Sequence, residues 1–195
     1  MLFRSRGVAI FAAQVLVAVE PRTGRELWQF PWKTKYDVNA ADPIFSSGSV
    51  FVSSGYRSGG ALMRRDGDTF TTVWKNQNMH NQLSPSVLID GYLYGCSGQN
   101  GYDTDLRCVD WQTGEVKWRE PSAGLGALMA ADGKLIVLGE KGELIIAEAT
   151  PAAFKALARA QVTGGKCWTV PVLSNGRIYC RNAKGDVVCL DVRGR

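Results

Sequence analysis

Several features that identify common protein classes are missing or rare in this 195-residue sequence. Its five cysteines include no adjacent pair and no Cys-x-x-Cys spacing, which argues against a zinc site and against a thioredoxin-like motif. No five or six basic residues follow one another and the net charge is only +5, so we expect no nucleic-acid partner. No apolar run is long enough for a transmembrane helix. The only histidine is His80.

The N-terminal residues imitate a secretion signal. Arg4 and Arg6 precede an apolar stretch over residues 8–19, which is the order of the basic and apolar regions of a signal peptide. However, residues 18–28 are in phase with residues 108–118, because both segments contain Thr-Gly and end in Trp. We therefore interpret the apolar stretch as two strands of a repeat, and we identify no convincing signal peptide in this chain.

The strongest pattern present is a repeated glycine. Four glycines that each precede a short strand-like run recur at intervals of 43, 42 and 43 residues: Gly48, Gly91, Gly133 and Gly176. A self-similar period slightly above forty residues, carried on short strands, is typical of a β-propeller. We therefore predict an all-β protein, a β-propeller in which this glycine opens the second strand of each blade.

An acidic residue and a tryptophan mark the same period. They are separated by eight positions in three units: Glu20 and Trp28, Asp66 and Trp74, Asp110 and Trp118. Two of these units contain Thr-Gly in between, which suits a tight hairpin whose glycine takes a positive φ. We expect the acid to end the third strand of a blade. The tryptophan then lies on the fourth, outermost strand and buries its ring against the neighbouring blade.

These markers divide residues 1–195 into one propeller segment of about four four-stranded blades. The approximate repeat units are 1–30 (partial), 31–75, 76–119, 120–162 and 163–195 (partial). The chain is expected to begin with the third and fourth strands of a blade and to end with a third strand. In the unit that lacks the tryptophan, Thr150-Pro151 and the following alanines predict a short helical turn before an outer strand over 157–162.

Two cysteine pairs fall in predicted hairpins. Cys180 and Cys189 flank the turn 182–186, which would set them side by side, and Cys96 and Cys108 occupy the corresponding hairpin of an earlier repeat. They are either small apolar residues packed in a sheet or a disulfide. Directly opposed strand positions seldom allow relaxed disulfide geometry, so we predict free thiols.

The Thr-Gly-x-x-x-Trp segments, each preceded by a strand that ends in an acid, resemble the PQQ-binding-like (quinoprotein-type) β-propeller repeat. The resemblance covers nearly the whole chain. Relatives include quinoprotein alcohol dehydrogenases and the lipoprotein scaffold of the barrel-assembly machine. Their rings usually have about eight blades, which implies that this chain is part of a larger ring; the alternative is four blades that close on themselves. The resemblance also implies a periplasmic or secreted location.

The resemblance implies PQQ with calcium only as an alternative. Those dehydrogenases are known for two adjacent cysteines over the quinone, a set of calcium ligands and a catalytic aspartate. This sequence has no adjacent cysteines, and no converging set of oxygen ligands can be identified from it. We therefore assign no cofactor, no metal ligand and no catalytic residue.

The loops that join an outer strand to the next inner strand gather around the channel of a propeller. Here they are residues 33–42, 76–82, 120–126 and 163–168, and they are rich in amide, aromatic and charged groups. Binding residues tend to lie on loops that a rigid scaffold positions. The predicted ligand-binding residues are Tyr36, Asp37, Asn39, Asn78, His80, Asn81, Lys166 and Trp168.

Several of these candidates have a plainer alternative. His80 suits a general base only if it reaches a substrate proton and has an orienting partner, and otherwise it is a hydrogen-bonding group. Asp37 and Asp42 are equally suited to capping turns. Trp168 is either a stacking platform or a plug of the channel.

Three functions fit these observations. The first, which we favour, is a non-catalytic binding or assembly platform with a protein partner or a small-molecule ligand at the channel face. The second is a PQQ-dependent alcohol or sugar dehydrogenase. The third is a glycan- or polymer-binding module that stacks its ligand on exposed aromatic side chains: Tyr36, Tyr56, Tyr102 and Trp111.

Overall fold

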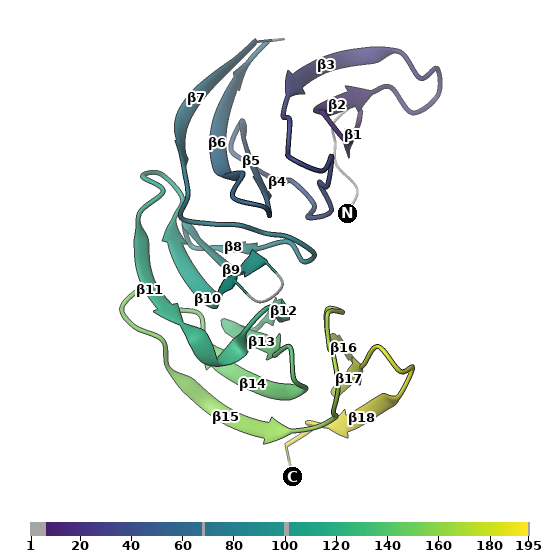
Figure 1. Ribbon diagram of the computed structural model, residues 1–195, viewed down its shortest axis with the longest axis vertical. Coiled ribbons are helices and arrows are strands. Elements are labelled where there is room, and N and C mark those ends of the chain that lie inside the picture. The colour runs from purple at the N-terminus through teal and green to yellow at the C-terminus, as the bar shows by residue number, and fades with distance from the viewer. Residues whose placement is uncertain (1–6, 68, 100–101, 195) are drawn as a thin grey trace.

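The computed structural model describes residues 7–67, 69–99 and 102–194. In these residues, five antiparallel sheets follow one another along an open arc (Figure 1). We call them blades 1 to 5 in chain order: blade 1 is β1–β3, blade 2 is β4–β7, blade 3 is β8–β11, blade 4 is β12–β15 and blade 5 is β16–β18. The all-β propeller prediction is confirmed, while the number of blades in a complete ring stays a prediction.

The strands pair in sequence order within each blade. Their bounds are β1 Val8–Phe11, β2 Val15–Val19, β3 Glu26–Pro31, β4 Ile44–Ser46, β5 Ser49–Ser54, β6 Gly59–Asp66, β7 Thr69–Asn76, β8 Val87–Ile89, β9 Tyr92–Gln99, β10 Tyr102–Asp110, β11 Val116–Glu120, β12 Ala127–Ala131, β13 Lys134–Leu138, β14 Glu143–Glu148, β15 Ala156–Gln161, β16 Val172–Ser174, β17 Arg177–Arg181 and β18 Val187–Asp191. One 3₁₀ turn, η1, covers Pro121–Ala123. The first strands β4, β8, β12 and β16 line the inside of the arc, and β7, β11 and β15 lie on its outside (Figure 1).

The repeated glycines occupy the tight turn before the second strand of each blade. In blades 2 to 5, two residues with positive φ connect the first and second strands: Ser47-Gly48, Asp90-Gly91, Asp132-Gly133 and Asn175-Gly176. A two-residue loop with positive φ at both positions is the type I′ turn, whose twist matches that of the flanking strands. The glycine period is therefore a period of hairpin turns.

Blade 1 contains one more strand than the sequence predicts. Residues 8–19 form β1 and β2, as expected, but these are the second and third strands of the blade, since the tryptophan strand β3 follows as the fourth. Gly7 directly precedes β1 and lies 41 residues before Gly48, so it continues the glycine period. The prediction that the chain begins with a third strand is wrong by one strand. Arg4 and Arg6 lie outside the described residues.

The helical turn predicted after Thr150 is absent: the described backbone between β14 and β15 is a bend. The Thr150 carbonyl does not accept a helical hydrogen bond; it accepts one from Trp118 Nε1 of blade 3 (2.8 Å). Phe154 packs edge-on against the same indole, with ring centroids 5.5 Å apart. Tertiary contacts with blade 3 thus override the local preference for a helix. The outer strand that follows, β15, agrees with the prediction.

The core consists of clusters between neighbouring blades rather than inside any one sheet. Three of the clusters contain a tryptophan of a fourth strand, and each tryptophan is 9% exposed. Trp28 packs edge-on against Phe70 of blade 2 (5.1 Å between centroids), and Trp74 Nε1 donates to the Trp111 carbonyl of blade 3 (2.8 Å). The fourth cluster, between blades 4 and 5, is formed by aliphatic side chains and cysteines. At the register position of the tryptophan, β15 carries Ala158, opposite Ile146.

The five cysteines are free thiols, four of them buried and Cys189 exposed. Cys180 pairs with Val188, and Cys189 with Tyr179. The two cysteines are therefore one position out of register and their side chains lie on opposite faces of the sheet. The expected side-by-side placement is wrong for this reason.

Candidate binding site

Each loop that leads from one blade to the next packs against a turn between second and third strands. Asn39 Nδ2 donates to the Ala12 and Ala13 carbonyls (2.8 and 3.0 Å) in the turn between β1 and β2. Asn182, in the turn between β17 and β18, likewise donates to the Gly164 carbonyl (2.9 Å). These contacts bring the blade-to-blade loops and the turns to one face, which we call the channel face.

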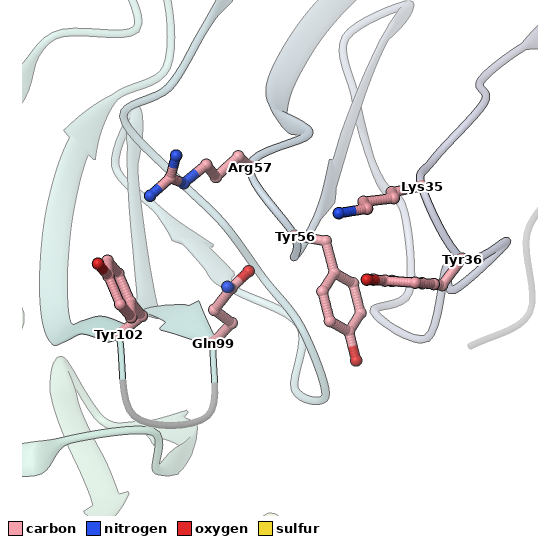
Figure 2. Close-up of a pocket in the computed structure, with 6 residues that line it drawn as sticks. All are labelled: Lys35, Tyr36, Tyr56, Arg57, Gln99 and Tyr102. Carbon is pink, nitrogen blue, oxygen red and sulfur yellow. The ribbon is translucent and has the colours of Figure 1, made fainter.

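Blades 2 and 3 and the loop before blade 2 form a hollow on this face. Its volume is about 370 Å³, and Figure 2 shows the side chains around it. The lining residues are Lys35, Tyr36, Tyr56, Arg57, Gln99 and Tyr102. The rings of Tyr36 and Tyr56 meet edge to face with centroids 4.8 Å apart. Tyr36 is 58% exposed and Tyr102 is 62% exposed, so a partner can reach both rings.

The local fold fixes the part of the hollow that comes from blade 2. Tyr56 and Arg57 lie in the turn between β5 and β6, with φ of 54° and 61°. The turn is closed by a hydrogen bond from the Ser58 amide to the Gly55 carbonyl (3.1 Å). Left-handed conformations are uncommon for residues other than glycine, and when they persist they often occur at functional sites. This conformation presents both side chains on the channel face.

A second cavity of about 290 Å³ adjoins the hollow and shares three of its residues. It is lined by Arg57, Gln77, His80, Gly98, Gln99, Tyr102 and Asp103. Among the described residues, His80 Nδ1 and Gln99 Oε1 are buried and have no hydrogen-bond partner. Buried polar atoms are usually paired, because an unpaired one costs about 1–3 kcal/mol. These two atoms mark the cavity as a place where hydrogen bonds to a polar ligand would be favourable.

A network of charges underlies the second cavity. Arg107, which is 3% exposed, donates from Nε to Asp105 and from Nη2 to Asp103 Oδ2 (2.8 Å). Arg119 bonds the same two carboxylates from the outer strand β11. Although burial acts in the opposite direction, hydrogen bonds from Arg107 and Arg119 lower the pKa of Asp103 below its ordinary value. The two positive and two negative charges balance, and the network links β10 to β11 at the second cavity, which Asp103 lines.

The charge state of His80 follows from its surroundings. Burial lowers its pKa below the ordinary value of 6.5, and the positive charge of Arg107 lowers it further. The Gln77 backbone and the charges of Asp103 and Asp105 act on the pKa in the opposite direction, and each of these effects is smaller. A neutral imidazole is therefore favoured at neutral pH, which suits a hydrogen-bonding role in the cavity wall.

The structure brings two of the predicted site residues, Tyr36 and His80, to these adjoining cavities. The amide side chains make internal contacts instead: Asn81 Nδ2 donates to the Cys96 carbonyl (3.1 Å) and Asn78 Nδ2 to the Gly114 carbonyl (2.7 Å). Asp37 is exposed in a turn, with a φ of 54°. The roles predicted for these residues stay predictions.

Two further candidates, Lys166 and Trp168, lie between blades 4 and 5 and line neither cavity. Lys166 Nζ stands 4.1 Å from the centroid of the Trp168 ring, and Trp168 Nε1 donates to Glu140 Oε1 (3.3 Å). Trp111, expected as an exposed stacking residue, is 5% exposed. That expectation is wrong, because Trp111 packs in the core between blades 2 and 3.

The predicted ligand-binding set omits five residues of the hollow: Lys35, Tyr56, Arg57, Gln99 and Tyr102. Tyr56 and Tyr102 are expected only as stacking residues of a glycan-binding module. Arg57 and Gln99 lie at turns between second and third strands, whereas the prediction considered only the loops between blades. In a blade of four antiparallel strands, both kinds of connection lie at the same end of the second strand, so the strand order alone could have pointed to them. Lys35 lies in a loop that the prediction did consider.

Comparisons with known proteins agree with this architecture. Residues 75–155, less than half of the chain, match the family model described as outer membrane protein assembly factor BamB. A crystal structure of BamB from Moraxella catarrhalis is similar over 97% of this chain and 55% of that chain, with 19% identity and a TM-score of 0.71. Quinohemoprotein alcohol dehydrogenase ADHIIG from Pseudomonas putida HK5 is similar over 92% of this chain and 39% of that chain, with 14% identity and a TM-score of 0.63.

A computationally designed protein, Ika4, is also similar, with 12% identity and a TM-score of 0.64, over 88% of this chain and 100% of that chain. A search of curated protein sequences returned no match. The chain thus spans about half of the BamB structure and less than half of the dehydrogenase structure. At these identities the structural similarities show the fold alone.

The successive antiparallel sheets with shared turns define a β-propeller repeat protein. Residues 75–155 match the BamB family model, and the structural neighbours share the propeller fold of the whole chain. No helix in the described part of the chain is long and apolar enough to cross a membrane.

The described residues do not fit a metal-assisted quinone site. Within residues 7–67, 69–99 and 102–194, no three His, Cys, Asp or Glu side chains come together in a way that could hold a metal ion. Asp103 and Asp105 are two carboxylates that lie near each other, but both already form ion pairs with Arg107 and Arg119. Calcium needs several converging oxygen ligands, and this donor set does not supply them.

Proposed function

We propose that this chain is a non-catalytic binding platform and that a protein partner docks on its channel face, centred on the hollow at blades 2 and 3. The observation that carries the proposal is the group of exposed Tyr36, Tyr102 and Arg57 around half-buried Tyr56, on a scaffold of sheets. Tyrosine and arginine are enriched among the residues that contribute most to protein–protein binding.

The shape of the site supports a platform. The hollow is open to solvent and lined by large side chains from three separate connections of the propeller. Anchoring residues in such a surface need little reorganisation, because the sheets beneath them are already formed. The description of the matched family, an assembly factor, is in line with this proposal. By the same analogy we propose a location outside the cytoplasm.

A quinone-dependent dehydrogenase is the second candidate, since a quinohemoprotein dehydrogenase shares the fold. The two functions are separated by titrating the purified chain with PQQ and calcium while following absorbance, and then adding alcohols or sugars with a reducible dye. The platform proposal predicts neither saturable PQQ binding nor dye reduction. Saturable binding with turnover would overturn it.

The docking site is tested by photocrosslinking in the cells from which the protein comes. A benzoylphenylalanine is placed at Tyr36, and the matched control places it at Val73, which is 39% exposed on the outer strand β7. We expect a discrete crosslinked protein from position 36 and not from position 73. Equal crosslinking from both positions, or none from position 36, would contradict docking at the hollow.

A further inference from the structure

The hollow at blades 2 and 3 has an unbalanced charge. Two of its six lining residues, Lys35 and Arg57, are cations, and none is a carboxylate. Among the described residues, neither cation makes a salt bridge. Among the other exposed cations of the described residues, some, such as Lys134 and Lys155, have a carboxylate partner, and others, such as Lys117 and Lys184, have none. The two positive charges of the hollow are therefore available to a ligand.

The cations are held above aromatic rings rather than beside acids. Lys35 Nζ stands 5.2 Å from the centroid of the Tyr36 ring, and Arg57 Cζ stands 5.6 Å from that of Tyr102. Such contacts restrict the position of a cation without neutralising its charge. In the view of Figure 2, Lys35 and Arg57 lie above the tyrosine rings, and Gln99 lies between Tyr102 and Tyr56. The arrangement presents two charges at separate points over one continuous surface.

The nearest carboxylates do not cancel this charge. Asp103 lines only the adjoining cavity, and its oxygens accept hydrogen bonds from Arg107 and Arg119. Asp37 follows Tyr36 in sequence but does not line the hollow. Electrostatic attraction at the hollow is therefore expected for an anion.

The other groups of the hollow favour a peptide over a small anion. Three tyrosines provide apolar ring faces and hydroxyl groups, which complement aliphatic or aromatic side chains of a partner. Gln99 Oε1, which lacks a hydrogen-bond partner among the described residues, is an acceptor suited to a peptide N–H. A compact anion such as phosphate would use the two cations and leave the rings uncovered.

We infer that the hollow recognises an acidic peptide segment of its partner, with Lys35 and Arg57 binding two of the segment's carboxylates and the tyrosines covering the chain between them. This inference deepens the proposed function and rests on it. Because the two cations are exposed, their contribution depends on ionic strength and each adds modestly to affinity. The tyrosines supply the larger, salt-independent part.

Fluorescence anisotropy with a labelled poly(Glu,Tyr) copolymer tests the inference on the full chain. We expect saturable binding that weakens between 50 and 300 mM salt, and no binding of poly(Lys,Tyr). Lys35→Gln and Arg57→Gln are each expected to weaken binding by up to about fivefold, the range of exposed charge pairs. Arg57→Lys keeps the charge and should restore most of the affinity. This variant separates loss of charge from a disturbed turn.

Lys166→Gln is the matched control, because Lys166 is also a cation above an aromatic ring but lies outside the hollow. Equal weakening by this variant, or failure of poly(Glu,Tyr) to bind, would overturn the inference. So would competition by heparin or inorganic phosphate at the same site with the same dependence on Arg57, since the site would then accept any anion.

The proposed function has a separate readout. If the protein crosslinked from position 36 is retained in the Lys35→Gln/Arg57→Gln double variant, the platform stands and the acidic-segment inference fails. If no protein is crosslinked in the unaltered chain, the platform itself fails, whatever the copolymer does.

Discussion

Replacing Trp118 tests how neighbouring blades are held together. Its indole is 9% exposed, packs against Tyr94 and Phe154 (5.9 and 5.5 Å between centroids), and donates from Nε1 to the Thr150 carbonyl of blade 4 (2.8 Å). Truncating a buried tryptophan to alanine removes its apolar contacts and leaves a cavity, which costs about 3–5 kcal/mol. We therefore expect Trp118→Ala to lower the free energy of unfolding by about this amount.

A second variant divides this free energy into two parts. Trp118→Phe keeps most of the ring contacts but removes the donor, so it should cost about 0.5–1.5 kcal/mol for the lost hydrogen bond, plus a smaller term for the reduced volume. Trp74→Phe removes the corresponding bond to the Trp111 carbonyl and should behave alike. The same result at two interfaces would show that the tryptophans act as repeated docking elements.

The measurement is urea unfolding followed by far-ultraviolet circular dichroism at constant temperature, with free energies extrapolated to zero denaturant. Equal destabilisation by Trp118→Phe and Trp118→Ala would show that ring packing does not supply most of this free energy, contrary to the expectation. The packing argument is refuted if Trp118→Ala costs less than about 1 kcal/mol, since such a value is typical of a surface substitution.

Other predictions concern thiols, pH and the buried charges. A disulfide reagent should rapidly modify only Cys189 in the native protein, and Cys189→Ser should abolish this fast phase. Two or more rapidly reacting thiols would contradict the burial of the other four cysteines. Because burial lowers the pKa of His80, the unfolded chain takes up a proton before the folded chain does as the pH falls below about 6.5. The free energy of unfolding should therefore decline in this range. Urea titrations at several pH values should show a flatter decline for His80→Gln. Asp105→Asn removes one of the two carboxylates that bind buried Arg107 and leaves Asp103 in place, so it should cost about 1.5–3 kcal/mol. Exposed Asp132→Asn should change the free energy of unfolding by less than about 0.5 kcal/mol.

The fold was predictable because its signals are local and repeated. Gly91 and Gly133 mark turns that need a positive φ, and Trp74 and Trp118 mark outer strands, so each unit confirms the others. The failures occur where the pattern changes. The helix expected after Thr150 was wrong because the loop bonds to a tryptophan of another blade, a contact that no local propensity encodes.

The candidate site was predictable only in part. The loops between blades follow from the strand order, which is why Tyr36 was among the expected residues. The strand order locates the turn that contains Tyr56 and Arg57, but their left-handed conformations, which present the side chains on the channel face, are not revealed by sequence patterns for residues other than glycine. Asn39 and Asn81 had the chemistry of binding residues, yet their amides hold loops and strands together. Sequence shows which side chains can bind, whereas packing decides which remain free to do so.

Ala158 makes the interface between blades 4 and 5 weaker than the other interfaces along the arc. Each blade is held mainly by its neighbours, so the stability of a repeat structure is close to a sum over successive interfaces. Where Ala158 replaces the outer-strand tryptophan, the cluster between blades 4 and 5 lacks the buried indole that the other three interfaces contain, and with it the hydrogen bond to the next blade that Trp74 and Trp118 donate. Blade 5 is therefore expected to separate first when the protein is pulled or warmed. In native-state hydrogen exchange, the amides of β17 should have a lower opening free energy than those of β9. The blades would then unfold at different free energies along the arc and not in one cooperative step.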